Sequence, residues 1–168
     1  MIKKIKFSFI RFLQLLLFLI PITMVTGPFL PDLFLSILVL LFIYVSLKNK
    51  LWKYYNNSYF KFFLILNLYL ILSSLLSSDP LYSIKTSLFY FRFTFFGLAT
   101  WYILENSNKE FLVKYVKYIA IFIIFLCVDG IFQSIFKENL FGFAMIENDR
   151  VSGLFRDDLI LGSYLSRL

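Results

Sequence analysis

The residues best suited to chemistry lie in one segment near the C-terminal end of the sequence, RVSGLFRDDLILGSYLSRL. Arg150 and Arg156 each carry a planar guanidinium group that can hold two phosphate oxygens at once. Gly153, between them, would let the backbone approach a ligand closely. These residue types predict a site for a phosphate-bearing anion. The alternative is a solvated loop in which the arginines pair with neighbouring aspartates.

Two acidic residues follow these arginines directly. Asp157 and Asp158 precede an apolar run that begins at Leu159, and such residues commonly cap the start of a helix. The helix N-terminus would then face the loop, where its unpaired N–H groups favour an anion. The pattern therefore predicts that the arginine loop leads directly into a helix.

The composition places this loop in a membrane protein. Of 168 residues, 60% are hydrophobic and 16% are charged, whereas soluble domains average about 25% charged residues. The net charge of +7 comes from cations flanking apolar segments, which predicts membrane orientation and no nucleic-acid partner. The sequence has no histidine and a single cysteine, Cys127, so we expect no internal disulfide and no protein-bound zinc or iron site.

The apolar runs predict an all-α transmembrane bundle, with residues 1–168 forming one transmembrane domain. Five runs approach the ~20 residues that cross a bilayer, and a sixth begins near the C-terminal end. The first is expected to act as an uncleaved signal anchor. The predicted spans are Phe7–Thr26, Phe29–Leu47, Phe62–Leu76, Ile84–Ile103 and Tyr118–Phe136, followed by residues 137–158 as a loop and Leu159–Leu165 as the start of the sixth.

The distribution of lysine and arginine predicts the orientation of these spans. Placing the N-terminus in the cytoplasm puts most of the 17 basic residues on the inner side, as expected for membrane proteins. The acidic residues then gather in the outer loops. This orientation places the loop 137–158, with Arg150, on the outer face.

Two charged residues lie inside predicted spans. Arg92 and Asp129 should face the bundle interior, because a charge facing lipid is costly. Both lie at a similar depth from the outer ends, so we expect them to form an ion pair. Lys85 lies seven residues before Arg92, on nearly the same helical face. The two cations could form a track for a diphosphate group; alternatively Lys85 extends to the surface and Arg92 pairs structurally.

The segment DRVSGLFRDDLILGSYLSRL resembles part of the bacterial O-antigen ligases and O-antigen polymerases. In that family an outer-loop arginine precedes a small residue, a glycine, a hydrophobic residue and phenylalanine. A polar pair and a helix with a Gly-Ser/Ala-Tyr stretch follow. The earlier segment PITMVTGPFLPDLFLSI is similar to the first loop and second span of the same family.

The resemblance implies an integral-membrane glycosyltransferase of the bacterial inner membrane. Such enzymes take a glycan from undecaprenyl diphosphate and pass it to lipid A-core or a growing polysaccharide at the periplasmic face, without a metal or other cofactor. Arg150 matches the arginine that grips the diphosphate and would stabilise the leaving group. Gly153 and Gly162 match backbone positions of the motif. The lipid-diphosphate site is therefore expected to comprise Arg150, Gly153, Arg156 and Arg92.

This sequence also departs from the family pattern. Family members are longer, and their large periplasmic loop carries another arginine and, in ligases, a histidine. We therefore expect an N-terminal part of a larger protein, inactive by itself and without a catalytic residue of its own. Two alternatives remain: a fragment of a polysaccharide transporter or flippase, for which internal repeats or paired broken helices would be expected, and a non-enzymatic membrane subunit.

Overall fold

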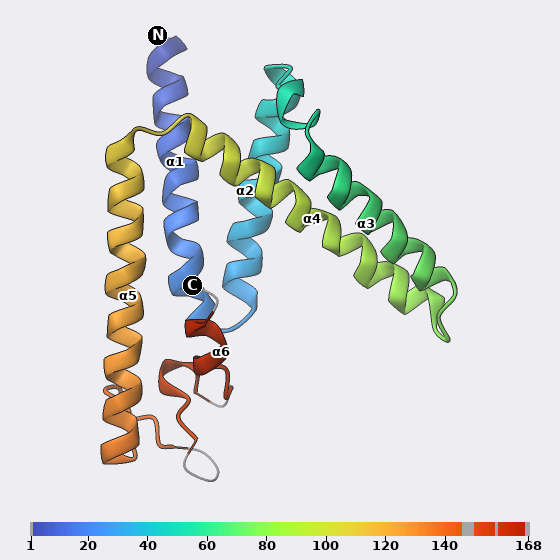
Figure 1. Ribbon diagram of the computed structural model, residues 1–168. Helices are drawn as coiled ribbons and strands as arrows, with labels where there is room; N and C mark the ends of the chain where they lie inside the picture. Colours follow the sequence, from blue (N-terminus) through green and yellow to red (C-terminus); the bar gives the residue numbers. More distant parts are fainter. Residues whose placement is uncertain (1, 146–149, 157, 167–168) are drawn as a thin grey trace. The chain divides into compact units, whose positions relative to one another are not determined.

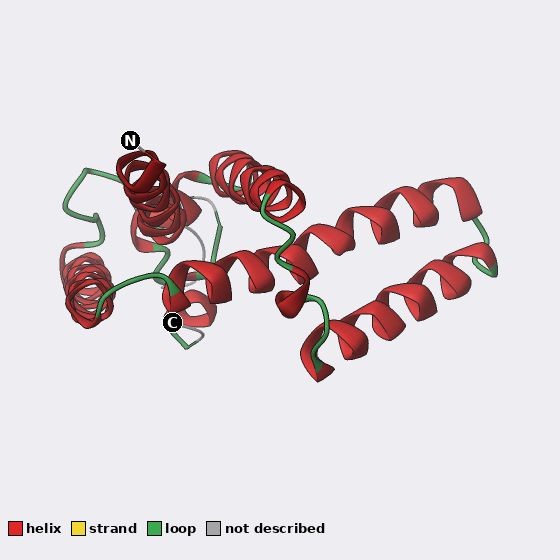
Figure 2. Ribbon diagram, turned by 90° about the horizontal axis from the view of Figure 1, so that it is seen from above, coloured by secondary structure: helices red, strands yellow, loops and turns green. Residues whose placement is uncertain are grey.

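The computed structural model describes residues 2–145, 150–156 and 158–166, and its regular elements are helices (Figure 1). Figure 2 shows helices and loops, with no strand in the described part of the chain. The predicted all-α fold is confirmed. The six α-helices are α1 (Ile2–Thr23), α2 (Phe29–Lys48), α3 (Ser58–Leu75), α4 (Pro80–Glu105), α5 (Lys109–Phe136) and α6 (Leu161–Leu165), and the short 3₁₀ helices are η1 (Met24–Thr26), η2 (Trp52–Tyr54) and η3 (Gly153–Phe155).

Four of these helices are long and apolar enough to cross a membrane: α1 continued through Thr26, α2, α3 and α5. They indicate a multi-pass membrane protein. The helix α4 has 26 residues, which is long enough for a bilayer. Its composition is less apolar, because Lys85 and Arg92 lie among tyrosine, serine and threonine side chains. By length and composition together, α4 is therefore not among the four.

Four helices, α1, α3, α4 and α5, begin earlier than the predicted spans, and two of them, α3 and α5, have a side-chain cap. The Asn57 side-chain oxygen accepts the Phe60 N–H at 2.8 Å, so α3 begins at Ser58. The Asn108 oxygen accepts the Phe111 N–H at 3.0 Å, so α5 begins at Lys109. Asparagine caps satisfy N–H groups that a helix start leaves unpaired. Residues 109–117, which lie between the predicted spans Ile84–Ile103 and Tyr118–Phe136, are thus helical.

The chain forms two compact units. Unit 1 comprises Met1–Leu17 and Asp32–Ser107, and unit 2 comprises Phe18–Pro31 and Asn108–Leu168. Within unit 1, α3 and α4 pair as an antiparallel hairpin, which both views show (Figures 1 and 2). Its interior includes small and polar side chains as well as apolar ones, as is common between helices in membranes.

Aromatic rings complete the interior of unit 1. Phe42 of α2 is fully buried. Its ring centre lies 6.2 Å from that of Tyr54 in η2 and 5.7 Å from that of Tyr102 in α4. Such edge-on and tilted ring contacts stabilise beyond their buried area. They join the end of α2 to η2 and α4.

Unit 2 is built around α5. The last turns of α1 are fixed to it by Tyr118, whose hydroxyl donates to the Phe18 carbonyl at 2.8 Å. The hydroxyl of Tyr164 in α6 donates to the Pro21 carbonyl at 2.7 Å. The Pro21 carbonyl is among the last four of α1, which lack N–H partners within the helix, and Tyr164 supplies one. Segments one hundred or more residues apart in sequence therefore share one packed unit.

Candidate functional site

Unit 2 contains a groove with a volume of about 900 Å³. Its walls come from the residues around η1, from α5, from the turn after α5 and from η3 with the residues that follow it. Most of the lining is apolar, and one basic side chain belongs to it. The lining residues are Ile22, Met24, Val25, Thr26, Gly27, Pro28, Pro31, Phe122, Phe141, Phe143, Leu154, Phe155, Arg156, Asp158 and Ile160.

Arg156 is the cation of this groove. Its side chain is exposed, and its guanidinium carbon lies 4.7 Å from the centre of the Phe143 ring. A guanidinium over an aromatic face keeps its edge N–H groups available to a ligand. Among the described residues, no ion pair or hydrogen bond occupies them. The backbone of Arg156 has φ 53°, a region that non-glycine residues seldom adopt.

Gly153, three residues before Arg156 in the chain, packs against α5. Its N–H donates to the Gln133 side-chain oxygen at 2.7 Å, and its carbonyl accepts from the Asn139 amide at 3.1 Å. With φ at +58°, a Cβ atom there would also lie 3.1 Å from a carboxylate oxygen of Asp129. The close approach that glycine permits is therefore an approach to α5. Gly153 is buried and does not line the groove.

A set of buried polar side chains holds this loop, and we call it the α5 polar cluster: Asp129, Gln133, Asn139 and Ser152. Each is at most 3% exposed. One Asp129 carboxylate oxygen accepts the Leu140 N–H at 3.0 Å. The Asn139 side-chain oxygen accepts the Phe143 N–H at 2.8 Å. The cluster thus fixes the turn that follows α5 by bonds to its backbone.

The structure gives Arg92 a different partner from the predicted one. Its guanidinium lies 2.9 Å from the Asp32 carboxylate in unit 1, and it also contacts the Phe93 ring at 5.0 Å. In place of the predicted ion pair with Arg92, Asp129 accepts a backbone N–H of its own unit. Asp32 lies in the first turn of α2, which brings it next to Arg92 of α4.

The four residues of the predicted diphosphate site have different surroundings in the structure. Arg156 lines the groove, and Gly153 supports the loop. Arg150 is exposed and does not line the groove. Arg92 belongs to unit 1. Binding of a lipid diphosphate by these residues stays a prediction.

The predicted helix cap also differs from the structure. Asp157 lies outside the described residues. The N-cap position of α6 is Ile160, and no side chain caps it. The Asp158 N–H instead donates to the Phe155 carbonyl at 3.1 Å, which continues the turn of η3. Asp158 is therefore part of the loop and lies on the groove wall.

Sequence reasoning missed Gln133 and Asn139. A signal was present for the first, because Gln133 lies four residues after Asp129 and therefore on the same face of the helix. Two polar residues at this spacing in an apolar run call for partners inside the protein. Nothing in the sequence indicated that these partners would be backbone groups of Leu140, Phe143, Ser152 and Gly153.

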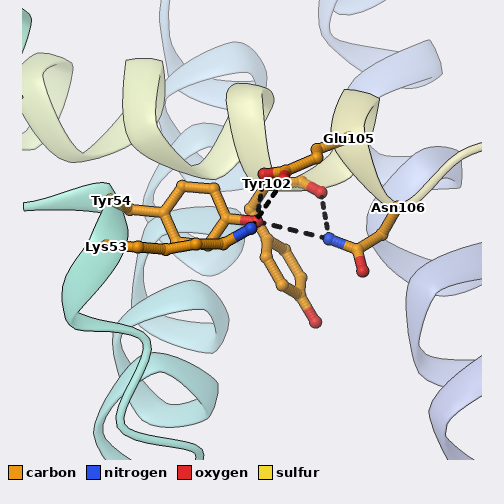
Figure 3. Close-up of polar contacts among 5 residues, drawn as sticks. All are labelled: Lys53, Tyr54, Tyr102, Glu105 and Asn106. Carbon is orange, nitrogen blue, oxygen red and sulfur yellow. Dashed lines mark hydrogen bonds and ion pairs between the residues drawn. The ribbon is translucent and has the colours of Figure 1, made fainter.

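A second polar group lies in unit 1, where η2 meets the end of α4 (Figure 3). Glu105 accepts from the Lys53 ammonium at 2.5 Å and from the Tyr54 hydroxyl at 2.6 Å. These two hydrogen bonds hold the pKa of the Glu105 carboxyl below its ordinary value. The hydrogen bond to Glu105 raises the pKa of Lys53. These hydrogen bonds tie η2 to the end of α4.

Within the described residues, no three histidine, cysteine, aspartate or glutamate side chains lie close enough to hold a metal ion. Comparison with protein-family models, with curated proteins and with solved structures finds no match to this chain. The candidate site therefore consists of the groove, Arg156 at its wall and the α5 polar cluster that supports them.

Proposed function

We propose that this chain is the N-terminal part of an O-antigen ligase-like membrane glycosyltransferase that binds an undecaprenyl-diphosphate-linked glycan. The observation that carries the proposal is the groove, which combines an apolar lining with the Arg156 guanidinium. A polyprenyl diphosphate has matching chemistry, because it joins a long apolar tail to an anionic headgroup. The resemblance of Arg150–Leu168 to the ligase and polymerase segment supports the same ligand.

In the proposed reaction, an acceptor hydroxyl attacks the anomeric carbon of the lipid-linked glycan. The bond from this carbon to the diphosphate oxygen breaks, and undecaprenyl diphosphate leaves with the bonding electrons. Arg156, which lines the groove, would stabilise the charge that develops on the leaving group. The resemblance implies the same role for Arg150, which lies outside the groove lining. The acceptor would be lipid A-core or a growing polysaccharide. No general base is assigned within this chain.

The proposed topology has five full spans, with α4 as the fourth, and a cytoplasmic N-terminus. Basic residues concentrate between α2 and α3 and at the start of α5, which favours these loops on the inner side. The turn after α5 and the groove beside it would then face the periplasm, at the outer surface of a bacterial inner membrane. Membrane lipid would cover the exposed apolar faces of the spans.

The test measures binding of undecaprenyl diphosphate to the chain reconstituted in lipid nanodiscs. Arg156→Ala should weaken binding about tenfold or more, because a charge-assisted hydrogen bond contributes roughly 1.5–3 kcal/mol. Arg156→Lys should retain part of the affinity as a point charge. Lys85→Ala, an exposed cation of unit 1, is the matched control and should bind normally.

Four results would contradict the proposal. Undecaprenol, which lacks the diphosphate, should bind less tightly than undecaprenyl diphosphate, and equal binding would exclude recognition of the headgroup. An Arg156→Ala chain that binds as tightly as the wild type would exclude the groove as the site. If Lys85→Ala were the weakened variant, the cationic track through Lys85 and Arg92 would replace the groove. Movement of the lipid-linked glycan across the membrane, with the bond to its lipid intact, would favour a transporter or flippase.

A further inference from the structure

Helix α5, which is long and apolar enough to cross a membrane, carries two fully buried polar side chains on one face. Asp129 and Gln133 are both 0% exposed in α5, four residues apart. Buried polar groups at this depth need partners, because no water is available to replace them. Their partners are the backbone groups of the loop that returns along α5, rather than side chains of another spanning helix.

Gln133 contacts both halves of this loop. Its side-chain oxygen accepts the N–H groups of Ser152 and Gly153 at 3.0 and 2.7 Å. Its amide nitrogen donates to the Phe143 carbonyl at 3.3 Å. Phe143 carries the ring against which Arg156 stacks, and Gly153 begins the 3₁₀ turn that Arg156 ends. One amide side chain therefore fixes both supports of Arg156.

We infer that Gln133 is a positioning residue: it holds the loop on α5 and thereby sets the place of Arg156 at the groove. It acts through Gly153 and Phe143 and does not itself line the groove. The consequence for anion binding rests on the proposed function. The consequence for the order of the loop does not, because it follows from hydrogen bonds within unit 2.

The side-chain oxygen is the part of Gln133 that should matter most. It is the acceptor for two buried backbone N–H groups, and buried N–H groups without an acceptor are costly. A carboxylate at this position would keep an acceptor for the Ser152 and Gly153 N–H groups but would lose the donor to the Phe143 carbonyl, whereas a thioether of similar length would offer neither. Gln133→Glu and Gln133→Met thus separate hydrogen bonding from side-chain volume.

The first measurement is hydrogen exchange of the Ser152 and Gly153 amides in the chain held in nanodiscs. Gln133→Met should raise their exchange rates at least tenfold, and Gln133→Glu should restore most of the protection. The matched control is Gln14→Met in unit 1, where the lost amide bonds to Ser107. This control should leave both rates unchanged. Unchanged exchange in Gln133→Met would overturn the inference.

The second measurement reads the position of residue 156 directly and needs no ligand. A nitroxide is attached through Arg156→Cys in a Cys127→Ser background, which removes the chain's own cysteine. The label should be more mobile with Gln133→Met than with glutamine or glutamate at that position. Equal mobility in all three backgrounds would reduce Gln133 to a general packing role and overturn the inference.

Binding of undecaprenyl diphosphate, measured with Arg156 intact, separates this inference from the proposed function. Weaker binding by Gln133→Met, restored by Gln133→Glu, supports both. Faster exchange and a mobile label with unchanged binding would overturn the role of Gln133 in ligand recognition. A wild-type chain that binds no probe overturns the proposed function, while exchange and label mobility still decide whether Gln133 positions Arg156.

Discussion

The two side chains that donate to the Glu105 carboxylate, Lys53 and Tyr54, contribute unequally to its positioning. Lys53 and Glu105 are exposed, and ion pairs between exposed side chains contribute little to stability. Tyr54 is 1% exposed, and burial is the largest cause that raises the pKa of its hydroxyl. The buried tyrosine therefore fixes the position of the carboxylate, and the lysine adds charge complementarity that depends on pH.

The stabilising effect of Glu105 should disappear in acid. Its pKa in the folded chain lies below its ordinary value of 4.5, so its contribution is complete above about pH 4.5 and is lost as the pH falls through the lowered pKa. We expect Glu105→Gln to lower the melting temperature at pH 7. The difference from the wild type should shrink steadily below pH 4.5 in thermal unfolding of the detergent-solubilised chain.

Lys53 limits the same contact at high pH. Its pKa is raised above 10.5 by the bond to Glu105, so the contact is fully formed below pH 10.5. Lys53→Gln is the control, and it should reduce the effect of Glu105→Gln at pH 7 without abolishing it, because Tyr54 still donates. A melting-temperature difference that stays constant from pH 7 to pH 3.5 would contradict this assignment.

Charged residues inside the spans were easier to find than to pair. The sequence identified Arg92 and Asp129 as residues that must avoid lipid, and their depths suggested that they pair. The structure gives Arg92 the carboxylate of Asp32, and it gives Asp129 a backbone N–H. Depth along separate helices does not specify which helices are neighbours, so the need for a partner was predictable and its identity was not.

Among the elements, the α3–α4 hairpin depends on polar contacts that its sequence shows only as small residues. Asn67 is 2% exposed and donates to the Thr94 hydroxyl at 2.9 Å. Ser74 and Ser87 also bond across the hairpin. Close to this interface, the Tyr59 side chain lies where a Cβ on residue 97 would be, so a larger residue there would displace the tyrosine ring. Hydrogen bonds across helices and close approach at glycine are typical of membrane helix pairs.

Removal of one such bond should weaken the hairpin measurably. Thr94→Val keeps the side-chain shape but removes the hydroxyl that accepts from Asn67. We expect a loss of about 0.5–1.5 kcal/mol in unfolding free energy, the range for hydrogen bonds between helices in membranes. Unfolding of the chain in mixed micelles would measure it.

Thr86→Val provides the matched control in the same helix. Thr86 is exposed, and its hydroxyl donates to the Tyr82 carbonyl at 3.2 Å, within α4. This substitution should change the unfolding free energy by less than Thr94→Val does. Equal effects of the two substitutions would mean that the hydrogen bond from Asn67 to Thr94 adds no more stability than a hydroxyl bonded within its own helix.

For the whole molecule, the decisive element is α4. Its neighbours α3 and α5 are apolar enough to span, so the path of the chain depends on whether α4 crosses between them. The charge of Arg92 is the main free-energy cost of placing α4 in a membrane. The ion pair with Asp32 lowers this cost. If α4 crosses the membrane, the chain has five spans. The C-terminal end of α3 and the N-terminal end of α5 then lie on opposite sides of the membrane.

Single cysteines can test this path. In a Cys127→Ser background, Asn49→Cys, Ser78→Cys and Lys109→Cys each place a thiol at an exposed position in a connection or at a helix start. With a cytoplasmic N-terminus and a crossing α4, a membrane-impermeant thiol reagent added to spheroplasts should label Ser78→Cys alone. Equal labelling of Ser78→Cys and Lys109→Cys would exclude α4 as a span, and labelling of Asn49→Cys would reverse the orientation.

The sequence by itself determined the helical class, the approximate spans and the arginine loop. These features follow from composition and from periodicity along the chain, which local side-chain chemistry sets. The tertiary structure decided that Asp32 pairs with Arg92, that Gly153 approaches α5 and that Gln133 holds the loop. These contacts join residues far apart in sequence, and they depend on which helix faces pack together. Hydropathy buries many side chains equally well and therefore cannot choose among such packings.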